Sequence, residues 1–289
     1  MNVRVIPRLD IKGPNLVKGI HLEGLRVLGR PEQFARFYYE QGADELLYMD
    51  VVASLYGRNS LLDIVQRTAR EMFIPLTVGG GLRSVDDITA VLRAGADKVS
   101  LNTAAVHSPD FIRAASRRFG SSTIVVSIEA IRHADGRYEA YTDNGRERTG
   151  VDAVAWAVRA AELGAGELLV TSIDREGTGE GFDLELTRAI AEAVSIPVIA
   201  CGGAGAMSHV AEAISDGKAD AVCLASMLHY DAVARRQAHG ECSAEGNTEY
   251  LKSQRAFSTI HTTSLPRLKA YLAEHGIACR TRPEECAHV

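Results

Sequence analysis

The sequence lacks three features that would assign it to a large class of proteins: an excess of basic residues, a motif of paired cysteines and a long apolar run. Its 289 residues include 32 Lys and Arg against 37 Asp and Glu, a formal net charge of −5. Without a basic surplus to neutralise a nucleic-acid backbone, nucleic-acid binding is a poor hypothesis. No apolar run approaches the roughly 20 residues that span a bilayer, so we expect no membrane segment.

The cysteines are few and isolated. There are five, an odd number, at separated positions and without a CxxC pair: Cys201, Cys223, Cys242, Cys279 and Cys286. This spacing argues against a disulfide framework and against a four-thiolate metal site. The chain opens without the pattern of a signal peptide, and we therefore expect a cytoplasmic location. Apolar residues make up 46% of the chain, enough to build a sizeable core.

What the sequence does have is an internal repeat. GADELL at 42–47 returns as GAGELL at 164–169, and IPLTVGGG at 74–81 returns as IPVIACGG at 196–203, both 122 positions later. ADKV at 96–99 returns as ADAV at 219–222, after 123 positions. Three matches in the same order at a nearly constant offset indicate that one half of the chain is a copy of the other.

Each half contains four short apolar runs separated by amphipathic segments. The runs alternate little, which is typical of parallel strands buried on both faces. They lie at 3–9, 45–51, 75–78, 98–101, 124–129, 167–172, 197–200 and 221–224. Eight such units in two matched halves predict an α/β protein with a closed (β/α)8 TIM barrel. An open doubly wound sheet is the competing interpretation, although it does not ordinarily repeat over half its length.

Two segments fall outside the repeat. Residues 12–30 follow the first predicted strand and are long for a barrel loop, which predicts a functional lid. Residues 230–264 are polar and lack periodicity, so we expect a partly flexible insertion there. The predicted organisation is a single barrel domain over residues 1–280 that carries this insertion, followed by a disordered tail at 281–289.

Glycine-rich turns follow the third and seventh predicted strands. In such barrels the working residues lie at the carboxyl ends of the strands, and phosphates bind where backbone N–H groups converge. The predicted phosphate-binding residues are Gly80, Gly81, Asn102 and Thr103 in the first half, and Gly202, Gly203, Ala225 and Ser226 in the second. A single turn of this kind would indicate only a tight bend. Two matched turns predict a long ligand with a phosphate at each end.

Two acidic residues, Asp10 and Glu129, end the first and fifth predicted strands, and by the repeat they face each other across the barrel mouth. Two carboxyls in a partly desolvated site can serve as proton donor and proton acceptor in general acid–base catalysis. Either residue alone would more often be structural. A symmetric pair between two phosphate sites favours catalysis.

Four charged residues begin strands at the opposite end of the predicted barrel: Arg4, Glu45, Lys98 and Glu167. The simpler interpretation is a salt-bridged plug, because this end of a barrel usually contributes to stability. The alternative is a gated entrance to a channel along the barrel axis. The pattern of charges fits both.

Several motifs resemble one known family, the cyclase subunit of imidazole glycerol phosphate synthase. They are IPRLDIK at 6–12, VKG at 17–19, GADEL at 42–46, IPLTVGGG at 74–81, DREGT at 174–178, IPVIACGGAG at 196–205 and AS at 225–226. The resemblance covers residues 3–228 and resumes at 265–280. It implies a lyase of histidine synthesis that needs no metal or organic cofactor. A glutaminase partner, in a heterodimer, would supply ammonia through the barrel to a ribulosyl-linked bisphosphate, giving imidazole glycerol phosphate and an aminoimidazole carboxamide ribotide.

The resemblance also implies roles for single residues. Asp10 matches a catalytic acid or base, and Lys18 lies in the matching mobile loop. The four charges at the strand starts match an ammonia gate, with Asp97 at a partner-facing position beside it. The predicted substrate-binding set is completed by residues at or after strand ends: Asp50, Thr171, Asp174 and Gly177.

The chain departs from the family pattern at four positions. Glu129 and Glu176 stand where the family has aspartates, Arg8 replaces a small residue and Leu22 replaces an aromatic one. A glutamate side chain is longer than an aspartate side chain, so its carboxyl group lies in a different place. A displacement of about 1 Å near a reacting centre can lower the rate roughly 100-fold. These changes suggest a divergent paralogue. The second hypothesis is therefore an ammonia-delivering subunit of a system that amidates surface sugars, and the third is a non-catalytic scaffold for a glutaminase.

Overall fold

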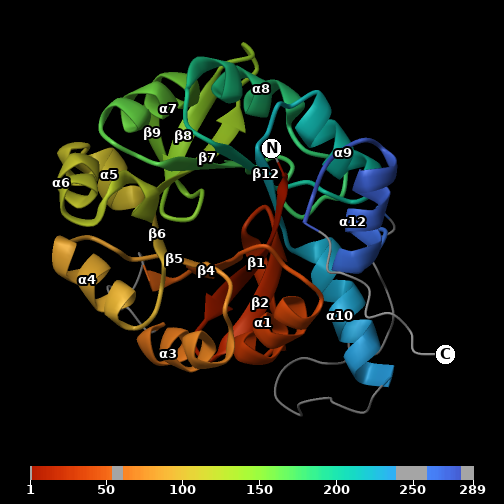
Figure 1. The fold of residues 1–289 in the computed structure, drawn as a ribbon. Coiled ribbons are helices and arrows are strands. Elements are labelled where there is room, and N and C mark those ends of the chain that lie inside the picture. The colour runs from red at the N-terminus through yellow and green to blue at the C-terminus, as the bar shows by residue number, and fades with distance from the viewer. Residues whose placement is uncertain (1, 54–60, 239–258, 281–289) are drawn as a thin grey trace.

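The computed structural model describes residues 2–53, 61–238 and 259–280, which form a closed barrel of parallel strands surrounded by helices (Figure 1). The predicted (β/α)8 fold is confirmed. The barrel strands are β1 (Arg4–Lys12), β4 (Leu46–Asp50), β5 (Leu76–Gly79), β6 (Lys98–Leu101), β7 (Ile124–Arg132), β10 (Glu167–Ser172), β11 (Val198–Cys201) and β12 (Ala221–Leu224). Each coincides with one of the predicted apolar runs to within a few residues.

Parallel pairing closes the sheet on itself. β12 pairs with β1 at one junction of the two halves, and β7 pairs with both β6 and β10 at the other. β7 therefore lies across the barrel from β1, with β4, β5 and β6 on one side and β10, β11 and β12 on the other. The strands that open the two halves of the repeat thus face each other, which is the arrangement that the repeat predicted.

Helices cover the outside of the barrel. They are α1 (Pro31–Glu40), α3 (Leu62–Glu71), α4 (Val85–Arg93), α5 (Thr103–His107), α6 (Asp110–Phe119), α7 (Ala153–Glu162), α8 (Leu184–Ala193), α9 (Met207–Ser215), α10 (Ser226–Ala238) and α12 (Leu265–Glu274), with a 3₁₀ turn η1 (Ser121–Thr123). Local signals fix where some of them begin. At the start of α4, the Ser84 hydroxyl accepts a hydrogen bond from the Asp87 N–H at 3.1 Å, and Asp87 accepts one from the Ser84 N–H at 2.9 Å.

The apolar core has two layers. The larger lies between the strands and the helices, where side chains such as Phe34 and Ile112 are fully buried. The smaller fills the inside of the barrel with Ile6, Leu47 and Leu169. Each large side chain removed from water stabilises the fold by roughly 1.5–3 kcal/mol. The inner layer also separates the charged residues at the strand starts from the polar residues at the strand ends.

Two β-hairpins extend the barrel strands, one in each half. β2 (Asn15–Ile20) and β3 (Glu23–Gly29) follow β1, whereas β8 (Tyr138–Thr142) and β9 (Glu147–Asp152) follow β7. The first hairpin occupies the segment expected to be a lid. The second was not predicted, although the turn at its tip, Asp143-Asn144-Gly145, has the composition that hairpins favour, and all three residues have positive φ.

A short turn is repeated at the amino ends of the strands. In three copies an aspartate accepts a hydrogen bond from the first backbone N–H groups of a neighbouring strand: Asp44 from Val5 at 2.8 Å, Asp97 from Leu76 at 2.9 Å and Asp220 from Val198 at 2.9 Å. The repeated GAD and KAD segments therefore have a structural function, joining each turn to the strand beside it. Asp97 belongs to this set.

The structure differs from the expectation for residues 230–264. α10 continues to Ala238, because Ala232 is buried and Val233 packs against the core, and Asp231 pairs with Arg235 one turn later at 2.7 Å. The insertion was therefore predicted to start too early. At the other end, the Ser264 hydroxyl accepts a hydrogen bond from the Arg267 N–H and begins α12. Residues 239–258 and the predicted tail at 281–289 lie outside the described residues.

Candidate functional site

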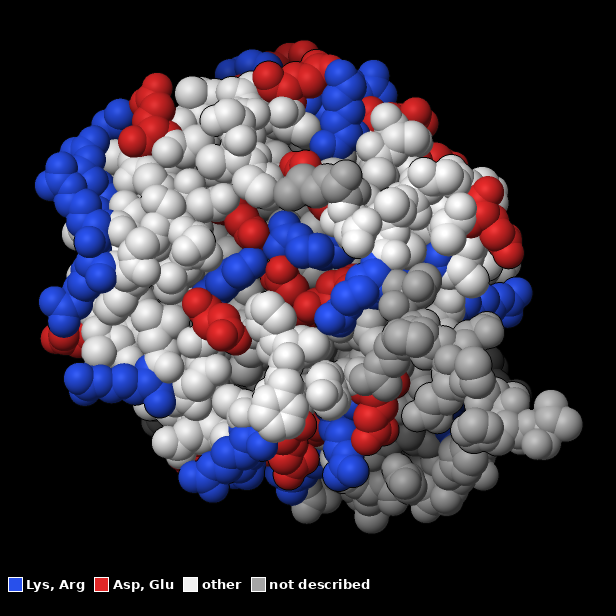
Figure 2. Space-filling model, viewed as in Figure 1, with Lys and Arg blue, Asp and Glu red and all other residues white. Residues whose placement is uncertain are grey.

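A ring of alternating charges lies at the amino end of the barrel. Arg4 Nη1 is 2.6 Å from Glu45 Oε1 and 3.0 Å from Glu167 Oε1. Lys98 Nζ is 3.2 Å from Glu45 Oε2 and 3.0 Å from Glu167 Oε1. Figure 2 shows basic and acidic side chains gathered at the centre of the barrel. The four predicted residues do converge, and because each cation contacts both carboxylates, moving either cation breaks two ion pairs.

The two candidate catalytic carboxyls lie toward the opposite end of the strands. Asp10 pairs with Val17 of β2, and Glu129 pairs with Tyr141 of β8. Each is thus the residue at which its barrel strand begins to pair with the hairpin that follows. Both are only 4% exposed. The repeated strand and hairpin therefore bring the two carboxyls to the same mouth and shield them from water.

Glu129 is buried and forms no direct ion pair with any residue that the structure describes. The Asn102 amide Nδ2 donates to Glu129 Oε2 at 3.1 Å and to the backbone oxygen of Tyr141 at 3.2 Å. Burial raises the pKa of Glu129 to about 7, although the charge of Arg8 and the backbone N–H of Gly145 lower it. A carboxyl that titrates near neutral pH can both accept and donate a proton, which is what general acid–base catalysis requires.

Asp10 differs from Glu129 because it has a cationic partner. Arg8 Nε donates a hydrogen bond to Asp10 Oδ1 at 2.7 Å, and both side chains are buried. Residues two apart on a strand project to the same face, so Arg8 and Asp10 both point into the barrel. In the sequence, Arg8 stands out only as a departure from a family pattern. The alternation of the strand would have placed it beside Asp10.

A cavity of about 360 Å³ lies at the strand ends of the first half. Predicted site residues line it: Asp50, Gly80, Gly81, Asn102, Thr103 and Glu129. Gly80 has a φ of +98°, and a Cβ there would lie 2.2 Å from the Asp50 backbone oxygen, so the turn requires glycine. The hairpin of the second half contributes Asp143 and Asn144 to the wall, and the Asp143 N–H donates to the Thr103 hydroxyl at 3.1 Å. These hairpin residues were not predicted.

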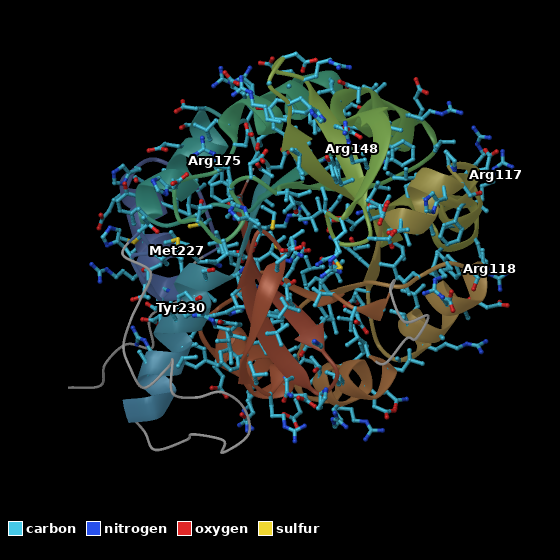
Figure 3. The ribbon with its side chains drawn as sticks, turned by 180° about the vertical axis from the view of Figure 1, so that it is seen from behind. Arg117, Arg118, Arg148, Arg175, Met227 and Tyr230 are labelled. Atoms are coloured by element: carbon cyan, nitrogen blue, oxygen red, sulfur yellow. The ribbon has the colours of Figure 1, made fainter. Side chains whose placement is uncertain are left out.

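The matching cavity in the second half measures only about 20 Å³. Its lining also contains predicted residues: Lys18, Gly177, Gly202, Gly203, Ala225 and Ser226. In Figure 3, which shows the molecule from behind, Arg175 and Met227 of this half lie on the side of the molecule opposite to Arg117 and Arg118 of the first half. Both predicted glycine turns thus line a hollow, but the sizes of the two hollows differ greatly.

Lys18 and Glu176 close the second hollow. Lys18 Nζ donates to a Glu176 carboxylate oxygen and, at 2.8 Å, to the backbone oxygen of Gly19. The other Glu176 oxygen accepts a hydrogen bond from the Leu22 N–H at 3.1 Å. Lys18 was expected in a mobile loop but lies on β2, where its side chain is 3% exposed. Glu176 therefore fastens the first hairpin to the loop that follows β10.

Three of the predicted catalytic and binding residues, Asp10, Thr171 and Asp174, line neither hollow. Thr171 is buried inside the barrel, where it is the register partner of Glu129 on the neighbouring strand. Asp174 Oδ2 accepts a hydrogen bond from the Arg132 N–H at 2.8 Å, which ties the loop after β10 to the end of β7. The structure gives Asp174 a supporting contact rather than a place in either cavity wall.

Within the described ranges, no cluster of three or more His, Cys, Asp and Glu side chains has the arrangement of a metal site. In the same ranges, no helix combines the length and the apolar character that crossing a membrane requires.

Known proteins with similar sequences match most of this chain. Residues 4–234 match the family model described as "Histidine biosynthesis protein". The imidazole glycerol phosphate synthase subunit HisF of Legionella pneumophila is 63% identical over 208 residues, which are 72% of this chain and 98% of that protein. The HisF subunit of Thermosynechococcus vestitus is 54% identical over 242 residues (82% and 86%), and that of Alkaliphilus metalliredigens is 50% identical over 231 residues (80% and 92%).

Proposed function

Because the chain belongs to the histidine biosynthesis family and, as its motifs predicted, to the HisF subunits of imidazole glycerol phosphate synthase, we propose that it is the cyclase subunit of such a synthase, a lyase. Its substrate is a ribulosyl-linked bisphosphate, which reacts with ammonia. The products are imidazole glycerol phosphate and an aminoimidazole carboxamide ribotide. The proposal includes a cytoplasmic location.

The observation that carries this proposal is the pair of buried carboxyls between two matched glycine turns. Backbone N–H groups at Gly81 and Gly203 can hold a phosphate at each end of an elongated substrate. Asp10 and Glu129 then lie beside the middle of the ligand, where bonds to nitrogen form and break. Addition of ammonia requires removal of protons from the attacking nitrogen, and cleavage requires a proton on the leaving group.

Ammonia enters, in this proposal, through the ring of Arg4, Glu45, Lys98 and Glu167. Displacement of a cation of the ring opens a path past the apolar interior to the carboxyls. A glutaminase docks on this amino-terminal face and releases ammonia there. The exposed aromatic residue Phe73, just before β5, supports a protein partner. Phe73 is 81% exposed, and its ring lies edge to face with that of Tyr39, with the two ring centroids 6.5 Å apart.

Turnover with ammonium salts tests the function without the partner. The purified chain is mixed with the ribulosyl-linked bisphosphate and ammonium chloride, and imidazole glycerol phosphate is quantified. Asp10→Asn and Glu129→Gln should each lower turnover by roughly 100- to 10,000-fold. Substrate affinity should change little, because the phosphates anchor the ligand. Glu129→Asp, which keeps a carboxyl, should retain activity. A wild-type chain that forms no product would contradict the proposal.

The small second hollow favours one alternative, an ammonia-delivering subunit of a system that amidates surface sugars. Lys18, Glu176 and Arg8 line this hollow, which offers only about 20 Å³ for a second phosphate. In this alternative ammonia passes through the barrel to another enzyme, and the bisphosphate is not a substrate. Glutamine-dependent amidation of a sugar, in the presence of a glutaminase and a sugar-activating enzyme but without turnover of the bisphosphate, would favour it.

A further inference from the structure

Arg8 is a buried cation inside the barrel mouth that the predicted site did not include. Its side chain is 3% exposed. Nε donates to Asp10 Oδ1 at 2.7 Å, and Nη1 donates to Cys201 Sγ on β11 at 3.5 Å. Nη2 is buried and has no hydrogen-bond partner within the part of the chain that the structure describes. Contacts to Asp10 and to a distant strand together fix the orientation of the guanidinium group.

The charge of Arg8 acts on both candidate catalytic carboxyls. It is bonded to Asp10 directly, and it is close enough to lower the pKa of Glu129 against the effect of burial. Among the described residues, the donors to Glu129 are neutral groups, the Asn102 amide and the Gly145 N–H. The guanidinium of Arg8 therefore lies near both carboxyls of the repeat. It donates a hydrogen bond to Asp10 and not to Glu129.

Other titratable groups surround this pair on the neighbouring elements. Hydrogen bonding with Cys223 and the charge of Arg8 lower the pKa of the Cys201 thiol, while burial raises that of Cys223. Lys18 and Glu176 are engaged with each other under the first hairpin. Other titratable or charged groups that face Glu129 or its cavity are Tyr141 on β8, Asp143 in the turn after it, Asp50 on β4, Arg83 after β5 and His107 at the end of α5. His229 on α10 interacts with the charge of Asp10. Arg8 is the cation in direct contact with a catalytic carboxyl.

We propose that Arg8 is a positioning residue that divides the work of the two carboxyls: it orients Asp10 through a charge-assisted hydrogen bond, whereas Glu129, bonded to neutral donors, exchanges protons with the substrate. A charge-assisted hydrogen bond from a guanidinium is strongest to the ionised carboxyl, so protonation of Asp10 would weaken it. Glu129 loses no such bond when it takes up a proton. The inference rests on the proposed function, because it concerns the same site.

The pH dependence of ammonia-dependent kcat/KM tests this division. The wild-type profile should contain a transition near pH 7 that Glu129→Gln removes. Arg8→Met removes the cation but keeps side-chain length, so the transition should move to higher pH by about one unit, as expected when an opposite charge leaves a buried carboxyl. Arg8→Lys should stay closer to the wild type. Arg117→Met, at the exposed rim in Figure 3, is the matched control and should leave the profile unchanged.

A measurement that needs no turnover separates this inference from the proposed function. The carboxyl carbon of Glu129 in ¹³C-glutamate-labelled protein is identified by its loss in Glu129→Gln. It should titrate near pH 7 in the wild type and about one unit higher in Arg8→Met. A titration that is unmoved in Arg8→Met, with only thermal stability reduced, means a purely structural role and overturns the inference. A moved titration without any turnover of the bisphosphate means that the proposed reaction fails while the electrostatic effect of Arg8 stands.

Discussion

The two halves of the barrel carry the same glycine turns, yet they offer cavities of about 360 Å³ and about 20 Å³. The turns themselves are alike, because Gly80 and Gly202 have φ values of +98° and +87°. The difference comes from side chains that reach over the turns. Lys18 and Glu176 join above the second turn, whereas Asp143 and Asn144 complete the wall of the first cavity. Duplication preserved the backbone, and the hairpins set how open each half is.

The two carboxyls show the same contrast. Asp10 and Glu129 occupy matching positions at the base of matching hairpins, but within the described part of the chain a guanidinium is bonded to Asp10 and none to Glu129. Burial without such a bond raises the pKa of Glu129 to about 7. A symmetric scaffold thus holds two chemically different acids, which is the difference that a reaction with separate proton transfers can use.

The largest effect should come from breaking the ion pair between Lys18 and Glu176 over the second hollow. Lys18→Met leaves the Glu176 carboxylate buried without a cation and should lower the free energy of unfolding by roughly 3–5 kcal/mol. Lys218→Met removes an exposed lysine that pairs with Glu192, and it should cost less than about 1 kcal/mol. Urea unfolding of both variants at pH 7 measures the difference. Equal losses would mean that the Lys18–Glu176 pair stabilises the fold no more than an exposed ion pair does, which would contradict the account.

A second effect concerns the pH dependence of stability that Glu129, the carboxyl of the second half, contributes. The pKa of Glu129 is raised from 4.5 to about 7 in the folded chain, so its contribution to stability is present below pH 4.5 and is lost as the pH rises through 7. The loss amounts to about 3 kcal/mol. Glu129→Gln removes this dependence, and its unfolding free energy relative to wild type should therefore increase by about that amount between pH 4.5 and pH 8.

The matched control for this measurement is Glu162→Gln, which changes an exposed glutamate on α7. Its difference from wild type should stay nearly constant over the same pH range. Chemical unfolding at several pH values gives both curves. A Glu129→Gln curve parallel to that of the wild type would mean that Glu129 titrates at its ordinary value.

The smallest effect tests how the hairpins meet over the mouth. Gly145 has a φ of +76°, and a Cβ there would lie 3.0 Å from Ile173 and 3.1 Å from Leu22 of the other hairpin. Gly136 also has a positive φ, +85°, but has nothing within 4 Å. Gly136→Ala should therefore cost about 1 kcal/mol through the backbone alone. Gly145→Ala should cost about 1 kcal/mol more through crowding. Equal costs in thermal unfolding would argue against packing between the hairpins.

Much of this architecture could be predicted from the sequence. The repeat and the apolar runs locate the eight strands, because strands buried on both faces need continuous apolar residues. The same repeat places Asp10 opposite Glu129 and predicts both glycine turns. The second hairpin was missed, since residues 138–152 lack a long apolar run and only the Asn144-Gly145 turn signals it.

The unequal access of the two halves could not be predicted in this way. It depends on contacts between residues distant in the chain, such as Lys18 with Glu176, which leave no local pattern. The bond between Arg8 and Asp10 is different, because strand alternation alone would have predicted that these residues share a face. The prediction ended helix α10 too early, because the few buried positions that hold the helix against the core do not stand out among its polar residues.

A crystal structure with the ribulosyl-linked bisphosphate bound would test the central claim most directly. The account predicts one ligand per chain, with one phosphate at Gly81 and Thr103 and the other at Gly203 and Ser226. Lys18 should then have left Glu176, and Asp10 and Glu129 should flank the middle of the ligand. A phosphate in the first cavity alone, with the Lys18–Glu176 pair intact and the rest of the ligand outside the barrel, would contradict it.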